Sequence, residues 1–188
     1  FPETLLPLHV FEPRYLALVD HVLEHGRLMG VASLAAGWEP SYYERPAIQP
    51  VLTVGRLLRR EDAEDGRCNI LVRGLARARV SDEAASEQLF RLVSAEVLPE
   101  PEDDDGLDLQ LATIRQLFGS VLARMPGAGA GTAAGLFNPE VPPRVLLNTI
   151  ATALPLSPGC KQAVLEADTL AERAELLAQE LVELTLVD

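Results

Sequence analysis

The chain has 188 residues, 48% of them hydrophobic, which is enough to bury one sizeable core or two small ones. Its net charge of −12 opposes general attraction to nucleic-acid phosphates. No stretch approaches the roughly 18 apolar residues of a membrane span, and residues 1–8 lack a secretory signal pattern, so we expect a soluble, cytoplasmic protein without a membrane partner. Cys68 and Cys160 are distant in sequence and predict neither a disulfide nor a metal framework.

The first half of the chain combines strand patterns with one helix. Apolar residues recur at helical spacing from about Pro13 to His25. In the run 75–80 the alternation predicts one buried face and one exposed face that carries Arg77 and Arg79. Gly55 predicts a bulge, and residues 64–66 predict a turn. Five strands are expected, at 28–34, 48–58, 69–73, 75–80 and 89–97. Together with the helix they indicate a compact, partly closed barrel.

Residues 99–106 form an acidic, proline-rich linker that divides the chain into a β-rich half, 1–98, and a helical half, 107–188. Within the second half, Ser157 is expected to cap a short helix, and Thr169 with Glu172 matches a capping box. Four helices are expected, at 107–125, 143–154, from Pro158, and at 169–186. The glycine- and alanine-rich run 126–135 is expected to be a mobile loop.

Three separated blocks carry a family pattern. The first runs from Phe1-Pro2 through Leu5-Leu6-Pro7-Leu8 to Arg14-Tyr15. The second comprises Pro50, Val54-Gly55, Leu57, 65–67 and 69–77, and the third comprises 154–157, 161–166 and 170–173. In this order the blocks resemble the N-terminal substrate-recognition domain of Lon proteases.

The resemblance implies an α+β fold, a PUA-like small β-barrel with one inserted helix followed by a C-terminal four-helix bundle. It also implies a module that engages polypeptide clients or a partner protein. Full Lon proteases continue into an ATPase domain and a Ser-Lys protease domain, whereas these residues contain no GxxxxGK[ST] phosphate loop. We therefore expect a stand-alone, non-catalytic binding module that uses neither ATP nor a cofactor.

An aromatic loop, residues 37–46, contains the only tryptophan, Trp38, together with Tyr42 and Tyr43. Aromatic side chains dominate the energetics of many protein contacts, so this loop is the leading candidate for a recognition surface. Its expected place is the rim of a groove between barrel and bundle. The alternative is that the rings plug the barrel mouth or cover the helical half. Arg14 is the further candidate for binding, although for Arg14 and Tyr15 a structural brace between helix and barrel is the preferred interpretation.

Two patterns suggest catalysis but have simpler structural explanations. His21, Glu24 and His25 match HxxEH, a zinc-hydrolase motif, but no further ligand is identifiable and the helix spacing favours a solvated face. The pair Ser157 and Lys161 matches a Ser-Lys dyad only in its composition, because Ser157 occupies a helix-cap position. We expect neither a metal site nor catalytic residues.

RNA binding is the other alternative, because some PUA-like barrels bind RNA. Seven arginines lie on or near the predicted strands, at positions 56, 59, 60, 67, 73, 77 and 79. No aromatic residue lies between Tyr43 and Phe90 to stack on bases. A solvated strand face, with the arginines paired to the acids at 61, 62, 64 and 65, is the preferred interpretation.

Overall fold

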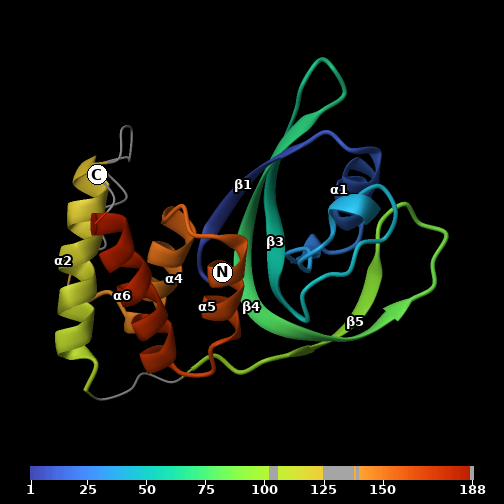
Figure 1. Cartoon of the computed structure of the whole chain (residues 1–188). Helices are drawn as coiled ribbons and strands as arrows, with labels where there is room; N and C mark the ends of the chain where they lie inside the picture. Colours follow the sequence, from blue (N-terminus) through green and yellow to red (C-terminus); the bar gives the residue numbers. More distant parts are fainter. Residues whose placement is uncertain (102–105, 125–137, 139, 187–188) are drawn as a thin grey trace. The chain divides into compact units, whose positions relative to one another are not determined.

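The computed structural model describes residues 1–101, 106–124, 138 and 140–186 (Figure 1). Backbone contacts divide the chain into two compact units, Phe1–Pro99 and Glu100–Asp188, and each is considered by itself. The predicted mobile loop at 126–135 and most of the acidic run of the linker lie outside the described residues. No helix in the described part of the chain has both the length and the apolar character needed to cross a bilayer.

The first unit is an antiparallel sheet with a single α-helix. The helix is α1, Pro13–Glu24, and the strands are β1 (Leu5–Val10), β2 (Leu28–Val31), β3 (Val51–Asp62), β4 (Cys68–Ala84) and β5 (Leu92–Val97). The strand order is β1-β4-β3-β2, and β5 also pairs with β4. Figure 1 shows β4 as a long curved strand; it pairs with β1 along 68–73 and with β5 along 78–84.

The predicted α+β class is confirmed, and the sheet of the described unit is open, without hydrogen bonds that close it into a full barrel. Two predicted strands, 69–73 and 75–80, form the single strand β4. The segment before the helix, for which no strand was predicted, is the strand β1. Gly74 makes this pairing possible, because a Cβ at that position would lie 2.0 Å from the carbonyl oxygen of Phe1.

Local features of the β3–β4 hairpin follow the sequence. The pairing register shifts between Val54 and Gly55, which confirms the predicted bulge. A Cβ on Gly55 would lie 2.4 Å from Cγ1 of Val72, so only glycine fits here without movement of its neighbour. The predicted turn is also present, with Gly66 at φ 80°.

The prediction that Arg77 lies on an exposed strand face was wrong. Arg77 is only 2% exposed, whereas Leu75 on the same strand is 39% exposed. The Arg77 guanidinium donates a hydrogen bond of 2.7 Å from Nη2 to the carbonyl oxygen of Pro99. This acceptor satisfies part of the hydrogen-bonding capacity of the guanidinium group, so the charged side chain is held in the interior. The alternation of arginines with small or apolar residues therefore does not decide which face of the strand is buried.

The helix α1 packs on the sheet through an apolar cluster. Val19 and Val22 from α1 join buried side chains of β1, β3 and β4. Pro13 occupies the first helical turn, where its missing N–H leaves no hydrogen bond unmade. Arg14, Tyr15 and Leu18, in the first turns of α1, lie near residues that follow β2 and β4.

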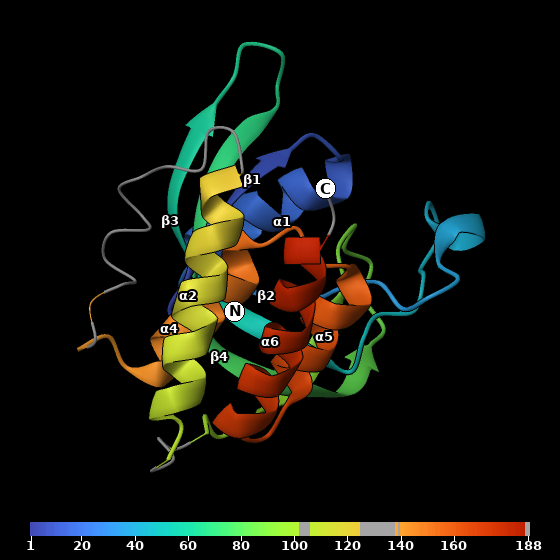
Figure 2. The same ribbon diagram turned by 60° about the vertical axis from the view of Figure 1, so that its left-hand side comes forward.

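The second unit is helical, as predicted. Its described helices are α2 (Asp108–Arg124), α4 (Pro143–Ala153), α5 (Pro158–Glu166) and α6 (Leu170–Leu186). Figure 2 shows α2 and α6 side by side. Ser157 accepts a hydrogen bond of 3.1 Å from the Cys160 amide, and Thr169 accepts one of 3.1 Å from the Glu172 amide, so both predicted caps are confirmed.

Candidate functional site

A pocket of about 520 Å³ lies wholly within the first unit. Its walls come from the first turns of α1, from β2 and the residues after it, from the end of the aromatic loop, and from the segment that leads into β5. Most lining side chains are apolar: Tyr15, Leu18, Met29, Val31, Ala32, Leu34, Pro46, Ile48, Leu52, Leu89, Phe90 and Val93. The remaining lining residues are Gly30, Glu44, Gln88 and three arginines, at 14, 45 and 91.

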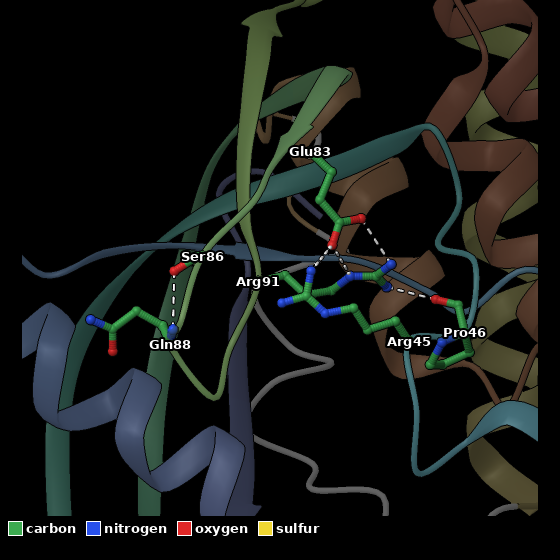
Figure 3. Close-up of polar contacts among 6 residues, drawn as sticks. All are labelled: Arg45, Pro46, Glu83, Ser86, Gln88 and Arg91. Carbon is green, nitrogen blue, oxygen red and sulfur yellow. Dashed lines mark hydrogen bonds and ion pairs between the residues drawn. The ribbon is translucent and has the colours of Figure 1, made fainter.

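Arg91 and Glu83 hold one side of the pocket together (Figure 3). Arg91 donates two hydrogen bonds of 2.9 Å to the Glu83 carboxylate, and a third, of 2.6 Å, to the carbonyl oxygen of Pro46. Arg45 approaches the same carboxylate at 3.3 Å. Hydrogen bonding from Arg91 is the main reason why the pKa of Glu83 lies below its ordinary value. These bonds of the Arg91 guanidinium group, the Arg91 fork, therefore join β4, the end of the aromatic loop and the segment before β5.

A short turn precedes β5 beside this fork. The amide of Gln88 donates a hydrogen bond of 3.1 Å to the hydroxyl oxygen of Ser86 (Figure 3). The turn presents Leu89, which is 66% exposed, and Phe90, which is 5% exposed, to the pocket. The buried ring of Phe90 thus forms part of the pocket wall, and the neighbouring Leu89 offers an accessible aliphatic side chain.

A second polar network anchors the aromatic loop to the start of α1. Arg14 donates from Nε to Glu12 at 3.0 Å and from Nη1 to the carbonyl oxygen of Tyr42 at 3.2 Å. The Tyr42 hydroxyl donates to the other Glu12 oxygen at 2.5 Å, and this bond is the main cause of a raised pKa for Tyr42. The Arg14 guanidinium carbon also lies 4.8 Å from the Tyr15 ring centroid and 5.0 Å from that of Tyr42.

The four residues expected to form a recognition surface lie in one neighbourhood. The ring centroids of Trp38 and Tyr42 are 5.3 Å apart, and those of Tyr42 and Tyr43 are 5.1 Å apart in an edge-on arrangement. Tyr43 is 93% exposed, whereas Trp38 and Tyr42 are half-buried. Only Arg14 of the four lines the pocket, although the end of the aromatic loop, residues 44–46, lines it as well. That these residues bind another molecule stays a prediction.

Sequence reasoning did not identify Leu18, Leu89 and Phe90 as residues of a site. Leu89 and Phe90 were assigned to a strand, but β5 begins only at Leu92. A signal was present, because two bulky apolar residues directly follow a polar stretch, 86–88, that is typical of a turn. That Leu89 and Phe90 lie near α1 depends on the tertiary fold.

The histidines of the HxxEH pattern interact with each other and with their own helix. The rings of His21 and His25 stack with centroids 4.1 Å apart, and Nδ1 of His25 lies 2.7 Å from the carbonyl oxygen of His21. Glu24 is exposed. Across the described residues, no three His, Cys, Asp or Glu side chains are grouped so as to hold a metal ion.

Several of the seven arginines on or near the strands have acidic partners. Arg60 pairs with Asp20 and with Asp62, Arg59 pairs with Glu61, and Arg67 lies 3.0 Å from Asp65. These contacts match three of the four acids named as expected partners. Arg77 is buried, so it does not contribute to an exposed basic face.

Nearly all of the chain matches a family model. Residues 1–183 fit the ATP-dependent protease La (LON) substrate-binding domain. The chain belongs to this Lon family. Its fold is similar to that of the N-terminal domain of the Lon protease of the Mycobacterium avium complex, with a TM-score of 0.74, 18% identity and coverage of 97% of this chain and 92% of that one. A Lon N-terminal domain protein from Xanthomonas campestris matches with a TM-score of 0.64, 24% identity and coverage of 95% and 90%.

The chain is also similar to proteins named Lon protease, which are much longer than the matched region. Lon protease 2 of Sorangium cellulosum is 30% identical over 184 residues, which cover 94% of this chain and 22% of the relative. Lon protease of Escherichia coli is 28% identical over 195 residues, with the same coverage. The chain thus spans about a fifth of the length of these proteases. The matched part is the substrate-binding domain, and the family supports a role in substrate recognition.

Proposed function

We propose that this domain binds exposed apolar segments of polypeptides, and that the pocket of the first unit is where an apolar side chain enters. The observation that carries the proposal is the pocket itself, with about 520 Å³ of mostly apolar lining in a chain of the Lon substrate-binding family. Apolar walls with a few fixed polar groups are the usual composition of binding pockets. Binding is expected without added nucleotide or metal.

The surface proposed for recognition extends from the pocket onto the aromatic loop. Tyr43 offers an exposed ring, and Arg14 belongs both to the pocket wall and to the network that anchors Tyr42. Large rings held in place lose little conformational entropy on binding, which favours their use in contacts. A client that fills the pocket would therefore also cover Tyr43 and Trp38.

Calorimetric titration with reduced, carboxymethylated α-lactalbumin, a permanently unfolded polypeptide, tests the proposal. Leu89→Gln removes an accessible apolar side chain at the pocket and should weaken binding by about tenfold, the equivalent of about 1.4 kcal/mol. Leu109→Gln is the matched control, because Leu109 is an exposed leucine of α2 in the other unit, at 82% exposure.

Hydrogen exchange with the same polypeptide maps the contact. Protection is expected in residues 29–34 and 88–93 and in the aromatic loop. Equal loss of affinity in L89Q and L109Q, or protection confined to the second unit, would disprove a binding role for the pocket.

A further inference from the structure

The outer edge of β2 forms part of the pocket, and its backbone orientation follows from the pairing with β3. Leu28 lies opposite Arg56, and the Leu57 amide donates to the Arg27 carbonyl oxygen at 2.8 Å. In an antiparallel pair, successive residues direct their backbone groups to opposite edges. Arg27 therefore faces β3, whereas Leu28 and Gly30 direct their N–H and C=O groups away from it.

The same alternation continues beyond the end of β2. The amide of Gln49 donates to the Ser33 carbonyl oxygen at 2.8 Å, and the amide of Ala35 donates to the Ala47 carbonyl oxygen at 2.8 Å. Residues 33 and 35 thus face the β3 side, and Leu34 between them faces outward. The outward set is Leu28, Gly30, Ala32 and Leu34, of which the last three line the pocket.

This edge is accessible. β2 stands at the end of the strand order, so within the described part of the chain no further strand covers it. Leu28 and Gly30 are both exposed. Glycine in a strand often marks a place where another backbone approaches closely. A Cβ on Gly30 would lie 3.3 Å from the side chain of Leu52, a buried residue of the pocket. The Leu52 side chain thus already fills the space beside Gly30.

We propose that the polypeptide bound by this domain is held as an added β-strand along the outer edge of β2, hydrogen-bonded to Gly30 and Ala32, with one apolar side chain in the pocket. Outward N–H and C=O groups on alternate residues repeat at about 6.8 Å, a spacing that another extended chain reproduces and a compact small molecule does not. Affinity then comes from main-chain bonds, and the pocket selects the side chain. This inference rests on the function proposed above.

Backbone methylation of a peptide tests strand addition without any change to the protein. The probe is an acetylated, amidated peptide of about eight residues that alternates leucine with serine, a length typical of a strand. A one-residue slip would move every leucine to the other face, so the side-chain pattern holds the register. Two derivatives carry N-methyl groups, one on the leucine amides and the other on the serine amides.

One derivative should lose at least about tenfold in affinity and the other should stay within about twofold of the parent peptide, because only one set of amides faces β2. The Gly30 amide should also exchange more slowly in the complex with the parent peptide. Equal binding by both derivatives, or equal loss in both, would overturn strand addition and leave the pocket proposal intact.

If the parent peptide does not bind, two explanations can be distinguished. If unfolded α-lactalbumin still binds and L89Q still weakens it, the pocket is used but strand addition is wrong. If the unfolded polypeptide does not bind either, the proposed function itself fails, and the inference fails with it.

Discussion

The hydroxyl of Tyr42 donates a hydrogen bond of 2.5 Å to Glu12, thirty residues earlier in the chain. Glu12 is the residue that precedes α1, and its other carboxylate oxygen accepts from Arg14. A single carboxylate therefore connects the start of the helix to the aromatic loop. The Trp38 ring packs beside Tyr42, with the two ring centroids 5.3 Å apart.

Tyr42→Phe should loosen the aromatic loop. The change removes the bond to Glu12 and leaves the ring in place, so we expect the free energy of unfolding to fall by about 1–2 kcal/mol. Because Trp38 is the only tryptophan, acrylamide quenching of its fluorescence reports on the loop directly. Quenching should increase in Y42F and stay unchanged in Tyr43→Phe, whose ring is 93% exposed. Identical quenching in the two variants would show that the Glu12 bond does not hold the loop.

Glu83→Gln should reduce stability in a pH-dependent way. Arg91 lowers the pKa of Glu83 in the folded protein below its ordinary value near 4.5. The folded state thus binds this proton less readily than the unfolded chain, so the stabilisation is complete above the ordinary value and is lost as the pH falls through the folded pKa. The difference between wild type and E83Q in urea midpoint should be largest near about pH 7 and shrink below about pH 4.5.

The control for Glu83 is the exposed Glu64, in the turn between β3 and β4. Glu64→Gln is expected to change the urea midpoint little at any of these pH values. A difference between wild type and E83Q that stays constant from neutral to acid pH would argue against the Arg91 fork as its source.

Gly74→Ala should destabilise the first unit by about 2 kcal/mol or more. A Cβ here would lie 2.0 Å from the Phe1 carbonyl oxygen. The backbone cannot retreat easily, because Gly74 accepts from the Glu3 amide and donates to the Thr4 carbonyl oxygen, both at 2.9 Å. Thermal unfolding followed by circular dichroism measures the effect. Gly159→Ala is the matched change, with its nearest neighbouring atom at 4.0 Å, and should be neutral or slightly stabilising.

Arg77→Met should cost about 1–3 kcal/mol, because it leaves the Pro99 carbonyl oxygen without its guanidinium donor. Arg79→Met, two residues along the same strand, removes an exposed arginine and should change stability by less than about 0.5 kcal/mol. Urea unfolding of the two variants measures the contrast. Equal stability of R77M and R79M would mean that the buried guanidinium contributes nothing that methionine cannot replace.

The helices and their ends could be predicted from the sequence because their determinants are local. Pro13, Ser157 and the pair Thr169 and Glu172 act within one turn of the helix that they begin, and the spacing of apolar residues marks the face to be buried. The bulge at Gly55 is similarly local. The family resemblance, read from three separated blocks, likewise needed only the order of residues.

Only the tertiary structure decided the pairing of β1 with β4, the burial of Arg77 and the pocket. Each depends on the approach of segments that are distant in the sequence: Phe1 to Gly74, Arg77 to Pro99, and the first turns of α1 to residues 88–93. A hydrogen-bond acceptor that the chain folds into place can hold a charged side chain in the interior, against the pattern of its own strand. Such contacts arise only when the backbone has closed the intervening loops, so residue order alone does not specify them.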